Sequence, residues 1–237
     1  ELPVYGSGGF CSSSLGRLGA QLGGWAAQGI PRVKMKVGRE PEADPSRLDA
    51  ARAAIGDETA LYVDANGAFG PKEALGWAER YAEEWGVTWF EEPVSSADAE
   101  GLRLVRERGP AGMDVAAGEY AYVPRDFLAL LDARAVDCLQ ADVTRCGRIT
   151  GLLLAAALAD ALEVDLSAHC APSASAHAFA GVARLRHLEW FHDHVRVEQM
   201  LFGGVLQPEG GVLRPDRSRP GNGLELKRAD AEHWQAA

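Results

Sequence analysis

Short apolar runs alternate along the chain with longer amphipathic segments, a pattern typical of β-strands separated by α-helices. The runs predicted to be strands are rich in β-branched and aromatic residues and occupy residues 2–6, 32–37, 60–65, 88–93, 114–119, 136–142, 164–169 and 187–191. The segments predicted to be helices repeat their apolar residues at helical spacing and occupy residues 13–29, 44–56, 71–86, 96–109, 124–134, 147–163 and 173–185. Ser, Asp or Pro at the first turn and Gly at the end support several of these helices.

Strands and helices that alternate in this way predict a parallel sheet with right-handed crossovers. The eight strands and seven helices favour a TIM-type (β/α)7β barrel, which is an α/β fold. A doubly wound open sheet is the alternative. No GxGxxG motif follows any predicted strand, so a dinucleotide site has no support.

The pattern changes after Phe191, where no eighth helix is predicted. The remaining residues are rich in Gly and Pro, and they predict turns and short strands before a brief helix. We therefore expect a barrel domain at residues 1–192 and a distinct carboxyl-terminal segment at residues 193–237.

The composition favours small-molecule chemistry in a soluble globular protein. The chain has 237 residues, of which 47% are hydrophobic, so it can bury a substantial core. Its formal net charge of -10 and the absence of any Lys/Arg run argue against binding to nucleic acid or to an anionic membrane surface. Four cysteines without CxxC spacing fit the reduced cytoplasm, and neither a membrane span nor a signal peptide is predicted.

Two lysines lie in an otherwise apolar strand, in the stretch VKMKVG at residues 33–38. Alternate side chains of a strand share a face, so Lys34 and Lys36 point one way and Met35 points the other. We predict that the lysines face the barrel mouth, where a lysine beside a cation and a second lysine has its charged form disfavoured and can act as a base. The alternative is a solvent-facing edge strand guarded by lysines, which helices outside a parallel sheet disfavour.

Three successive predicted strands each end in a carboxylate, namely Asp64, Glu91 and Glu119, which are 27 and 28 residues apart. The carboxyl ends of barrel strands meet at one rim, where the active sites of such barrels lie. Three carboxylates held together raise each other's pKa unless a cation neutralises them. Because all the donors are oxygens, Mg²⁺ is the expected ion, and we favour this site over the alternative that these residues only cap helices.

Asp142 and His169 end two neighbouring predicted strands on the other side of the barrel. A carboxylate bonded to an imidazole fixes its tautomer and raises its basicity, so this pair is a second candidate acid/base. Cys170 is expected to point to the opposite face, which disfavours a Cys/His nucleophile pair. Four other histidines are expected to be structural: His177, His187, His192 and His194.

Glu189 lies on the eighth predicted strand and enters the same mouth. If it is held protonated, it could donate a hydrogen bond to a developing oxyanion. A surface glutamate is the alternative.

In order and spacing, these residues resemble the mandelate racemase subgroup of the enolase superfamily. The resemblance runs from about Tyr5 to Leu226 and rests on the motifs VKMKVG, VDANGAF, WFEEP, AAGE, QADVTRCGRITG, SAH and LEWF. It implies that Mg²⁺ is held by Asp64, Glu91 and Glu119. It also implies that Lys36, with Lys34 beside it, is one acid/base and that Asp142 with His169 is the opposing one. The remaining roles that it implies are a hydrogen bond to the enolate from Glu189 and a substrate contact from Asn66.

The chain departs from the family pattern in two places. Arg148 stands where family members often have a second glycine after the sixth strand. Because the sequence opens at the first predicted barrel strand, we expect the amino-terminal α+β capping domain of the family to be absent from this chain. We therefore expect residues 193–237 to be the segment that would pack on that domain.

The resemblance implies abstraction of the proton α to a carboxylate through an enediolate. We predict dehydration of a sugar acid, an aldonate or aldarate, to a 2-keto-3-deoxy acid, with racemisation or epimerisation of a 2-hydroxy or sugar acid as the alternative. A noncatalytic ligand-binding barrel is the alternative from another class, and a hydrolytic metallo-barrel is disfavoured because the first strand has no His-x-His pair. The expected partners are a small carboxylate substrate and further copies of the chain in a homo-oligomer, and neither nucleic acid nor a membrane.

Overall fold

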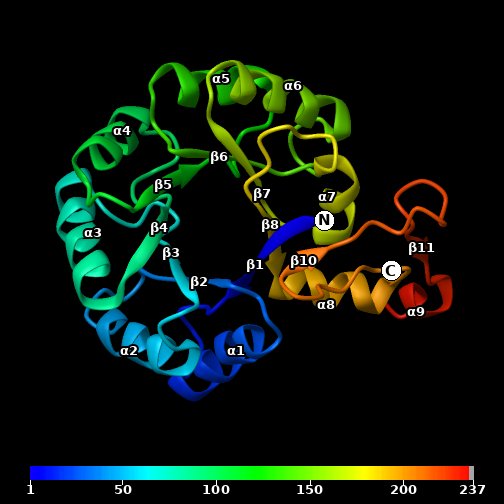
Figure 1. Cartoon of the computed structure of the whole chain (residues 1–237), viewed down its shortest axis with the longest axis horizontal. Helices are drawn as coiled ribbons and strands as arrows, with labels where there is room; N and C mark the ends of the chain where they lie inside the picture. The colour runs from blue at the N-terminus through cyan, green and yellow to red at the C-terminus, as the bar shows by residue number, and fades with distance from the viewer. Residues whose placement is uncertain (235–237) are drawn as a thin grey trace.

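The structure of the protein is a computed structural model that describes residues 1–234. Within this range, eight parallel strands form the wall of a barrel, and β1 to β7 pair with one another in chain order (Figure 1). These strands are β1 (Leu2–Gly8), β2 (Arg32–Lys36), β3 (Ala60–Asp64), β4 (Val87–Glu91), β5 (Asp114–Ala117), β6 (Cys138–Ala141), β7 (Asp165–Ala168) and β8 (Leu188–Phe191). The barrel closes because β8 pairs with β1 and the Ala168 N–H of β7 donates to the His187 carbonyl at 3.0 Å.

Seven helices connect these strands and form a ring outside them, which confirms the predicted TIM-type arrangement (Figure 1). They are α1 (Leu15–Ala27), α2 (Asp44–Ile55), α3 (Pro71–Trp85), α4 (Ala99–Arg108), α5 (Pro124–Asp132), α6 (Arg148–Ala161) and α7 (Pro172–Phe179). In α1, Leu18, Leu22 and Trp25 form an apolar stripe that is buried against the sheet. Within residues 1–234, no helix combines the length and the apolar character that crossing a membrane requires.

The two faces of each strand have different environments. Val33 and Met35 on the outer face of β2 are fully buried against the helices. Below the mouth, the inside of the barrel is filled by a separate cluster around Tyr5, Tyr62 and Trp89, so the barrel is a packed core and not a pore.

The carboxyl-terminal segment begins with a helix, α8 (His192–Leu201), which follows β8 directly. The prediction that no eighth helix follows Phe191 is therefore wrong. None of the residues of α8 is buried, so this helix packs no side chain fully into the core.

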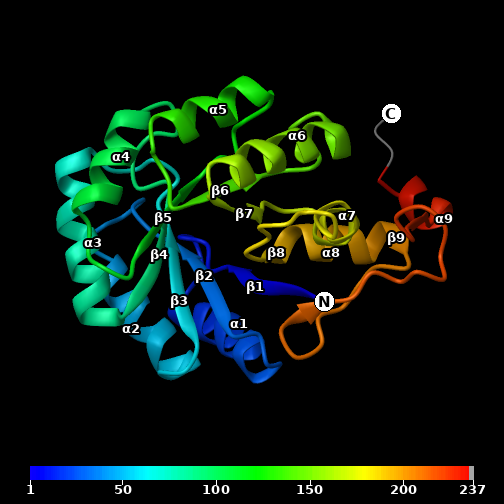
Figure 2. The same ribbon diagram turned by 45° about the horizontal axis from the view of Figure 1, so that its top comes forward.

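The rest of the segment consists of turns, short strands and one short helix, as predicted. These elements are β9 (Phe202–Gly203), β10 (Val212–Leu213), β11 (Glu225–Leu226) and α9 (Arg228–Glu232). β10 pairs antiparallel with β1, and β11 pairs with β9 at the side of the barrel (Figures 1 and 2). The packing of this segment on a capping domain stays a prediction.

Candidate active site

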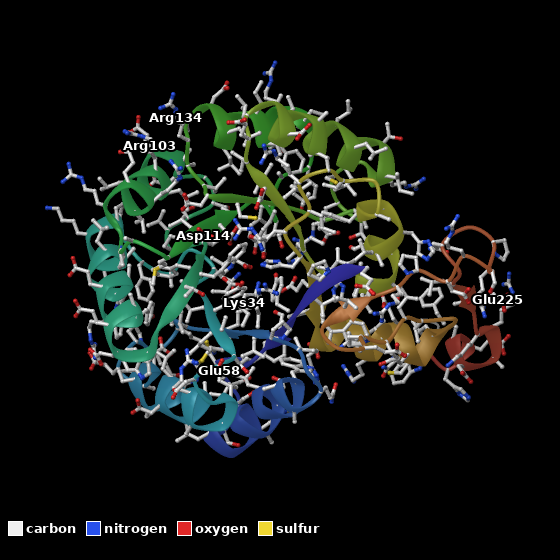
Figure 3. All side chains as sticks on the ribbon, viewed as in Figure 1. Lys34, Glu58, Arg103, Asp114, Arg134 and Glu225 are labelled. Carbon is white, nitrogen blue, oxygen red and sulfur yellow. The ribbon has the colours of Figure 1, made fainter. Side chains whose placement is uncertain are left out.

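Asp64 and Glu91 are the last residues of β3 and β4, and Glu119, Asp142 and His169 follow the ends of β5, β6 and β7. Lys34 lies near the centre of the ring (Figure 3). Strand register places several of them side by side. Lys36 on β2 is level with Asp64 on β3, and Asp64 is level with Glu91 on β4. Residues far apart in the sequence thus become neighbours on one rim.

The three carboxylates of the predicted metal site lie together. Asp64, Glu91 and Glu119 are buried, and one ligand atom from each lies within 4.8 Å of the others. The buried Glu119 Oε2 makes no hydrogen bond of good geometry, and its nearest cationic neighbour is the His169 Nε2 at 3.2 Å. An all-oxygen donor set with an unsatisfied oxygen fits Mg²⁺. In the following text, these three residues are called the carboxylate triad.

Gly118 allows Glu119 to reach the other two members of the carboxylate triad. β5 ends at Ala117, and the φ angle of 135° at Gly118 turns the chain in a conformation that side chains disfavour. A Cβ atom at this position would lie 2.2 Å from the carbonyl oxygen of Gln140. The motif AAGE therefore needs its glycine for a close approach of two backbones.

Both lysines of β2 face the inside of the barrel. β2 lies between β1 and β3 in the sheet, which rules out the alternative of a solvent-facing edge strand. The Lys34 Nζ lies 2.5 Å from Glu91 Oε1 and 2.9 Å from Glu189 Oε1. Lys36 forms an ion pair with Asp64.

The charges around the lysines favour their protonated forms. Burial and Lys34 lower the pKa of Lys36, but the Asp64 and Glu91 carboxylates together outweigh them, so the pKa lies above its usual range. The pKa of Lys34 is also raised, because Glu189 and Glu91 outweigh its burial. The predicted lowering of the lysine pKa is therefore not found in this structure, in which Asp64 pairs with Lys36.

Two members of the carboxylate triad differ in their affinity for protons. Burial raises the pKa of Asp64, but Lys36 and Lys34 outweigh it and hold this pKa below its usual value. The pKa of Glu91 is well above its usual value, because burial and the charge of Asp64 both oppose its ionisation. The Glu91 carboxyl is therefore harder to ionise than the Asp64 carboxyl.

Asp142 and His169 form the predicted pair on the opposite side of the site. The His169 Nδ1 lies 2.8 Å from Asp142 Oδ2, which leaves Nε2 directed at the mouth, 3.2 Å from Glu119 Oε2. Burial lowers the pKa of His169, but Asp142, Cys170 and Glu119 outweigh it and raise this pKa well above its usual value. The imidazole is therefore charged at neutral pH.

Cys170 lies beside the imidazole, and its predicted position on the opposite face is wrong. β7 ends at Ala168, and the φ angle of 51° at Cys170 breaks the alternation of a strand. The Cys170 Sγ lies 3.3 Å from His169 Nε2. Because burial raises the pKa of Cys170 to about 12, the group is a thiol and not a thiolate nucleophile at neutral pH.

Glu189 is buried in the mouth, so the alternative of a surface glutamate is wrong. Its Oε2 accepts a hydrogen bond from the Cys170 N–H at 2.8 Å, and its Oε1 faces Lys34. Burial raises the pKa of Glu189, but Lys34 and His169 outweigh it and hold this pKa below its usual value. The group is therefore an ionised acceptor and not the protonated donor that we predicted.

Asn66 lies at the edge of a cleft of about 410 Å³ that opens beside Lys36. Its backbone N–H donates to Asp64 Oδ1 at 2.8 Å, while the residue itself is exposed. Arg39 also lines this cleft and adds a positive charge. A ligand in the cleft would therefore touch Lys36, which forms an ion pair with Asp64 of the carboxylate triad.

Sequence reasoning missed Glu92, the second glutamate of WFEEP. This residue is 1% exposed, and its Oε1 has no hydrogen-bond partner. Burial and then Glu119 raise the pKa of Glu92 to about 8. The doubled acid at a strand end was the available signal, because only one of two successive strand residues can face the barrel. The φ angle of 39° at Glu92 explains why both glutamates nevertheless lie near the site.

Arg148 has a φ angle of 62°, in the left-handed region that favours glycine. The residue that replaces the family's glycine therefore keeps a glycine-like backbone, at a cost of about 1 kcal/mol.

Residues 17–231 match the model of the enolase C-terminal domain-like family. The chain belongs to this family. A solved structure of a mandelate racemase/muconate lactonizing enzyme-like protein from Rubrobacter xylanophilus is 60% identical, with a TM-score of 0.96, and the match covers 98% of this chain and 64% of that protein. The resemblance to the mandelate racemase subgroup is thereby confirmed.

Two further relatives of this chain have the names of enzymes. The 3,6-anhydro-alpha-L-galactonate cycloisomerase of Streptomyces coelicolor is 31% identical over 95% of this chain and 61% of its own length. The structure of L-talarate dehydratase from Polaromonas sp. JS666, complexed with Mg and L-glucarate, is 28% identical with a TM-score of 0.85, over 100% of this chain and 64% of that protein. The chain thus spans less than two thirds of the length of each.

The wider set of relatives comprises sugar-acid dehydratases, cycloisomerases and epimerases. Magnesium is present in solved relatives, and the carboxylate triad is an acidic group that could hold it in this chain. Both findings agree with the predicted Mg²⁺ cofactor.

Proposed function

We propose that this site abstracts the proton α to the carboxylate of a sugar acid in a Mg²⁺-dependent reaction, and that the outcome is dehydration to a 2-keto-3-deoxy acid. One observation carries the proposal. Lys36 and His169 flank the carboxylate triad. Lys36 forms an ion pair with Asp64, and the His169 Nε2 lies 3.2 Å from Glu119 Oε2. A substrate bound between them would have a proton-transferring group on each side.

Asp64, Glu91 and Glu119 would hold the metal ion in this proposal. Bound Mg²⁺ would supply positive charge that stabilises the negative charge growing on the substrate as its α proton leaves.

Lys36 is the proposed base. Its pKa is raised by the free carboxylate of Asp64, against the opposing effects of burial and Lys34. If Asp64 and Glu91 held a metal ion, their charges would no longer favour the ammonium form of Lys36. Burial and Lys34 would then lower the pKa of Lys36, so that a neutral amine could take the α proton.

His169 is the proposed acid. Its partner Asp142 is not a member of the carboxylate triad, so the Nδ1 contact at 2.8 Å is kept whether or not the triad binds a metal. The imidazole therefore keeps its proton and can donate it from Nε2 to a β-hydroxyl group, which leaves as water. Return of a proton to carbon from this side would instead give an epimer, which is the second candidate outcome.

The cleft beside Lys36 supports an anionic, hydroxylated substrate. Arg39 supplies a positive charge and Asn66 a polar edge to this cleft of about 410 Å³. In the related Polaromonas dehydratase the complexed ligand is L-glucarate, a sugar acid. A small carboxylate with hydroxyl groups is therefore the substrate class that we propose.

The proposal is tested by incubating the chain with Mg²⁺ and a set of aldonic and aldaric acids in D2O. We expect a 2-keto acid from at least one substrate, detected with semicarbazide, and none in the presence of EDTA. Lys36→Ala should slow α-proton exchange, followed by NMR, by about a hundredfold or more. His169→Asn should stop keto-acid formation while exchange continues, and Lys72→Ala, at an exposed position on α3, is the matched control.

Other results would overturn parts of this assignment. Isomers without any keto acid would favour epimerisation over dehydration. Unchanged turnover in both Lys36→Ala and His169→Asn would remove these residues from the mechanism. Absence of exchange with every acid in the Mg²⁺-saturated chain would favour a noncatalytic barrel.

A further inference from the structure

We propose that His169, Cys170 and Glu189 form a second metal site, which takes a soft divalent cation such as Zn²⁺ and removes the imidazole from acid/base use. One donor atom from each residue lies within 4.8 Å of the others. All three residues are buried, with 7%, 3% and 2% of their surface exposed. The site lies beside the carboxylate triad but shares no residue with it.

The donor atoms decide which ion each site takes. Imidazole nitrogen, thiolate sulfur and carboxylate oxygen are the three ligand types of protein zinc sites, and three protein ligands leave a fourth position open. Mg²⁺ prefers oxygen ligands alone. The two neighbouring sites would therefore select different ions from a mixture.

The imidazole is already oriented for ligation. Asp142 holds the His169 Nδ1 at 2.8 Å, so Nε2 points toward the Cys170 Sγ, 3.3 Å away. A carboxylate on the other ring nitrogen is the usual support of a metal-bound histidine, because it sets the tautomer and raises the basicity of the ligating nitrogen.

The backbone after His169 is also held in place. The φ angles of 51° at Cys170 and 44° at Ala171 lie in the left-handed region, which costs free energy for residues with side chains. Two bonds secure the turn at Cys170: its N–H donates to Glu189 Oε2 at 2.8 Å, and its carbonyl accepts the Ser175 Oγ–H at 2.9 Å. The Ala171 N–H donates to the His194 Nδ1 at 3.1 Å. These contacts keep Sγ on the side of the imidazole.

Metal binding at this site displaces two protons. One leaves the Cys170 thiol and one leaves the His169 Nε2, as the metal–sulfur and metal–nitrogen bonds form. Affinity should therefore rise with pH. A metal on Nε2 occupies the lone pair that would carry the proton to the leaving group, so the ion should inhibit dehydration. This inhibition rests on the proposed function, whereas the metal site itself does not.

The experiment titrates Co²⁺, a coloured substitute for Zn²⁺, into the full chain in excess Mg²⁺, which occupies the carboxylate triad. We expect a near-ultraviolet thiolate-to-cobalt charge-transfer band that saturates at one equivalent and is displaced by Zn²⁺. Cys170→Ser and Cys170→Ala should abolish the band. Cys146→Ser is the matched control, since Cys146 is buried after β6 in a different loop, and it should keep the band.

The outcomes separate the metal site from the proposed function. No band in the wild-type chain, or a band that survives in both Cys170 variants while their thermal unfolding shows a folded protein, would overturn the site. A band without any turnover would keep the site and count against the proposed function. Where turnover is measured, Zn²⁺ should inhibit the wild-type chain at a concentration at least about tenfold lower than Cys170→Ser.

Discussion

Each member of the carboxylate triad has a cationic partner of its own. Asp64 pairs with Lys36, Glu91 lies 2.5 Å from Lys34, and Glu119 lies 3.2 Å from His169. Burying single charges costs several kcal/mol each, and pairing offsets much of that cost. Substitution of one partner therefore changes the charge balance of the whole group. Control substitutions belong at sites outside it.

His187 shows the opposite case, a buried histidine that stays neutral. It lies inside the barrel with its ring centroid 4.6 Å from that of Tyr5, and its Nδ1 lies 2.8 Å from the Ser167 Oγ. Burial, and then Arg32 and Arg186, hold its pKa well below 6.5. Its predicted structural role is consistent with this position.

We predict a dependence of stability on pH that comes from His187. Below about pH 6.5 the unfolded chain binds a proton at this residue and the folded chain does not. The free energy of unfolding should therefore fall by about 1.4 kcal/mol for each unit by which the pH drops below about 6.5. His187→Gln should remove this contribution, as measured by urea unfolding from about pH 8 to about pH 5.5. His233→Gln, at an exposed position, should keep the wild-type slope. Equal slopes in wild type and His187→Gln would contradict the prediction.

The unpredicted helix α8 supplies a cap to α7. The residue before α7, Ala171, has no side-chain cap of its own. Glu198 of α8 instead accepts the Ser173 Oγ–H at 2.7 Å and lies 3.3 Å from the Ser173 N–H in the first turn of α7. A carboxylate at this place also interacts favourably with the helix dipole.

We predict that Glu198→Ala destabilises the chain by about 1–2 kcal/mol, because the first turn of α7 loses its cap. Chemical denaturation measures this difference. Gln199→Ala on the same helix removes an exposed side chain and should stay within about 0.5 kcal/mol of the wild type. If the two variants are equally stable, the capping role of Glu198 is wrong.

Metal binding should stabilise the folded chain as a whole. The carboxylate triad joins β3, β4 and the turn after β5, and the unfolded chain does not hold these residues together. At an Mg²⁺ concentration of 100 times the Kd, the free energy of unfolding should rise by about 2.7 kcal/mol. Glu119→Gln should lose most of this gain, measured as the shift in Tm on adding Mg²⁺, whereas the exposed Glu100→Gln on α4 should keep it. No shift in the wild type would argue against the site.

The homo-oligomer expected from the sequence stays a prediction. The division into residues 1–192 and 193–237 also stays a prediction, although β10 ties the second part to β1 of the barrel.

The sequence alone was sufficient to predict the barrel and the rim on which the site lies. Strand and helix periods are local properties of the chain, so the alternation of apolar runs predicted the seven βα units. Once the strands are parallel, Asp64, Glu91 and Glu119 must meet at one end, and alternation along β2 directs both lysines inward. These conclusions need no knowledge of distances.

Contacts between distant segments decided the rest. The inward position of Cys170 depends on a left-handed turn held by Glu189 and Ser175, and the ionised state of Glu189 depends on Lys34, from the other end of the chain. Charge interactions and desolvation act through space and vary with ångström-level separations, which no pattern of residue types along the chain encodes. Local periodicity therefore identified the elements and the candidate residues, and packing in three dimensions assigned their partners and their protonation.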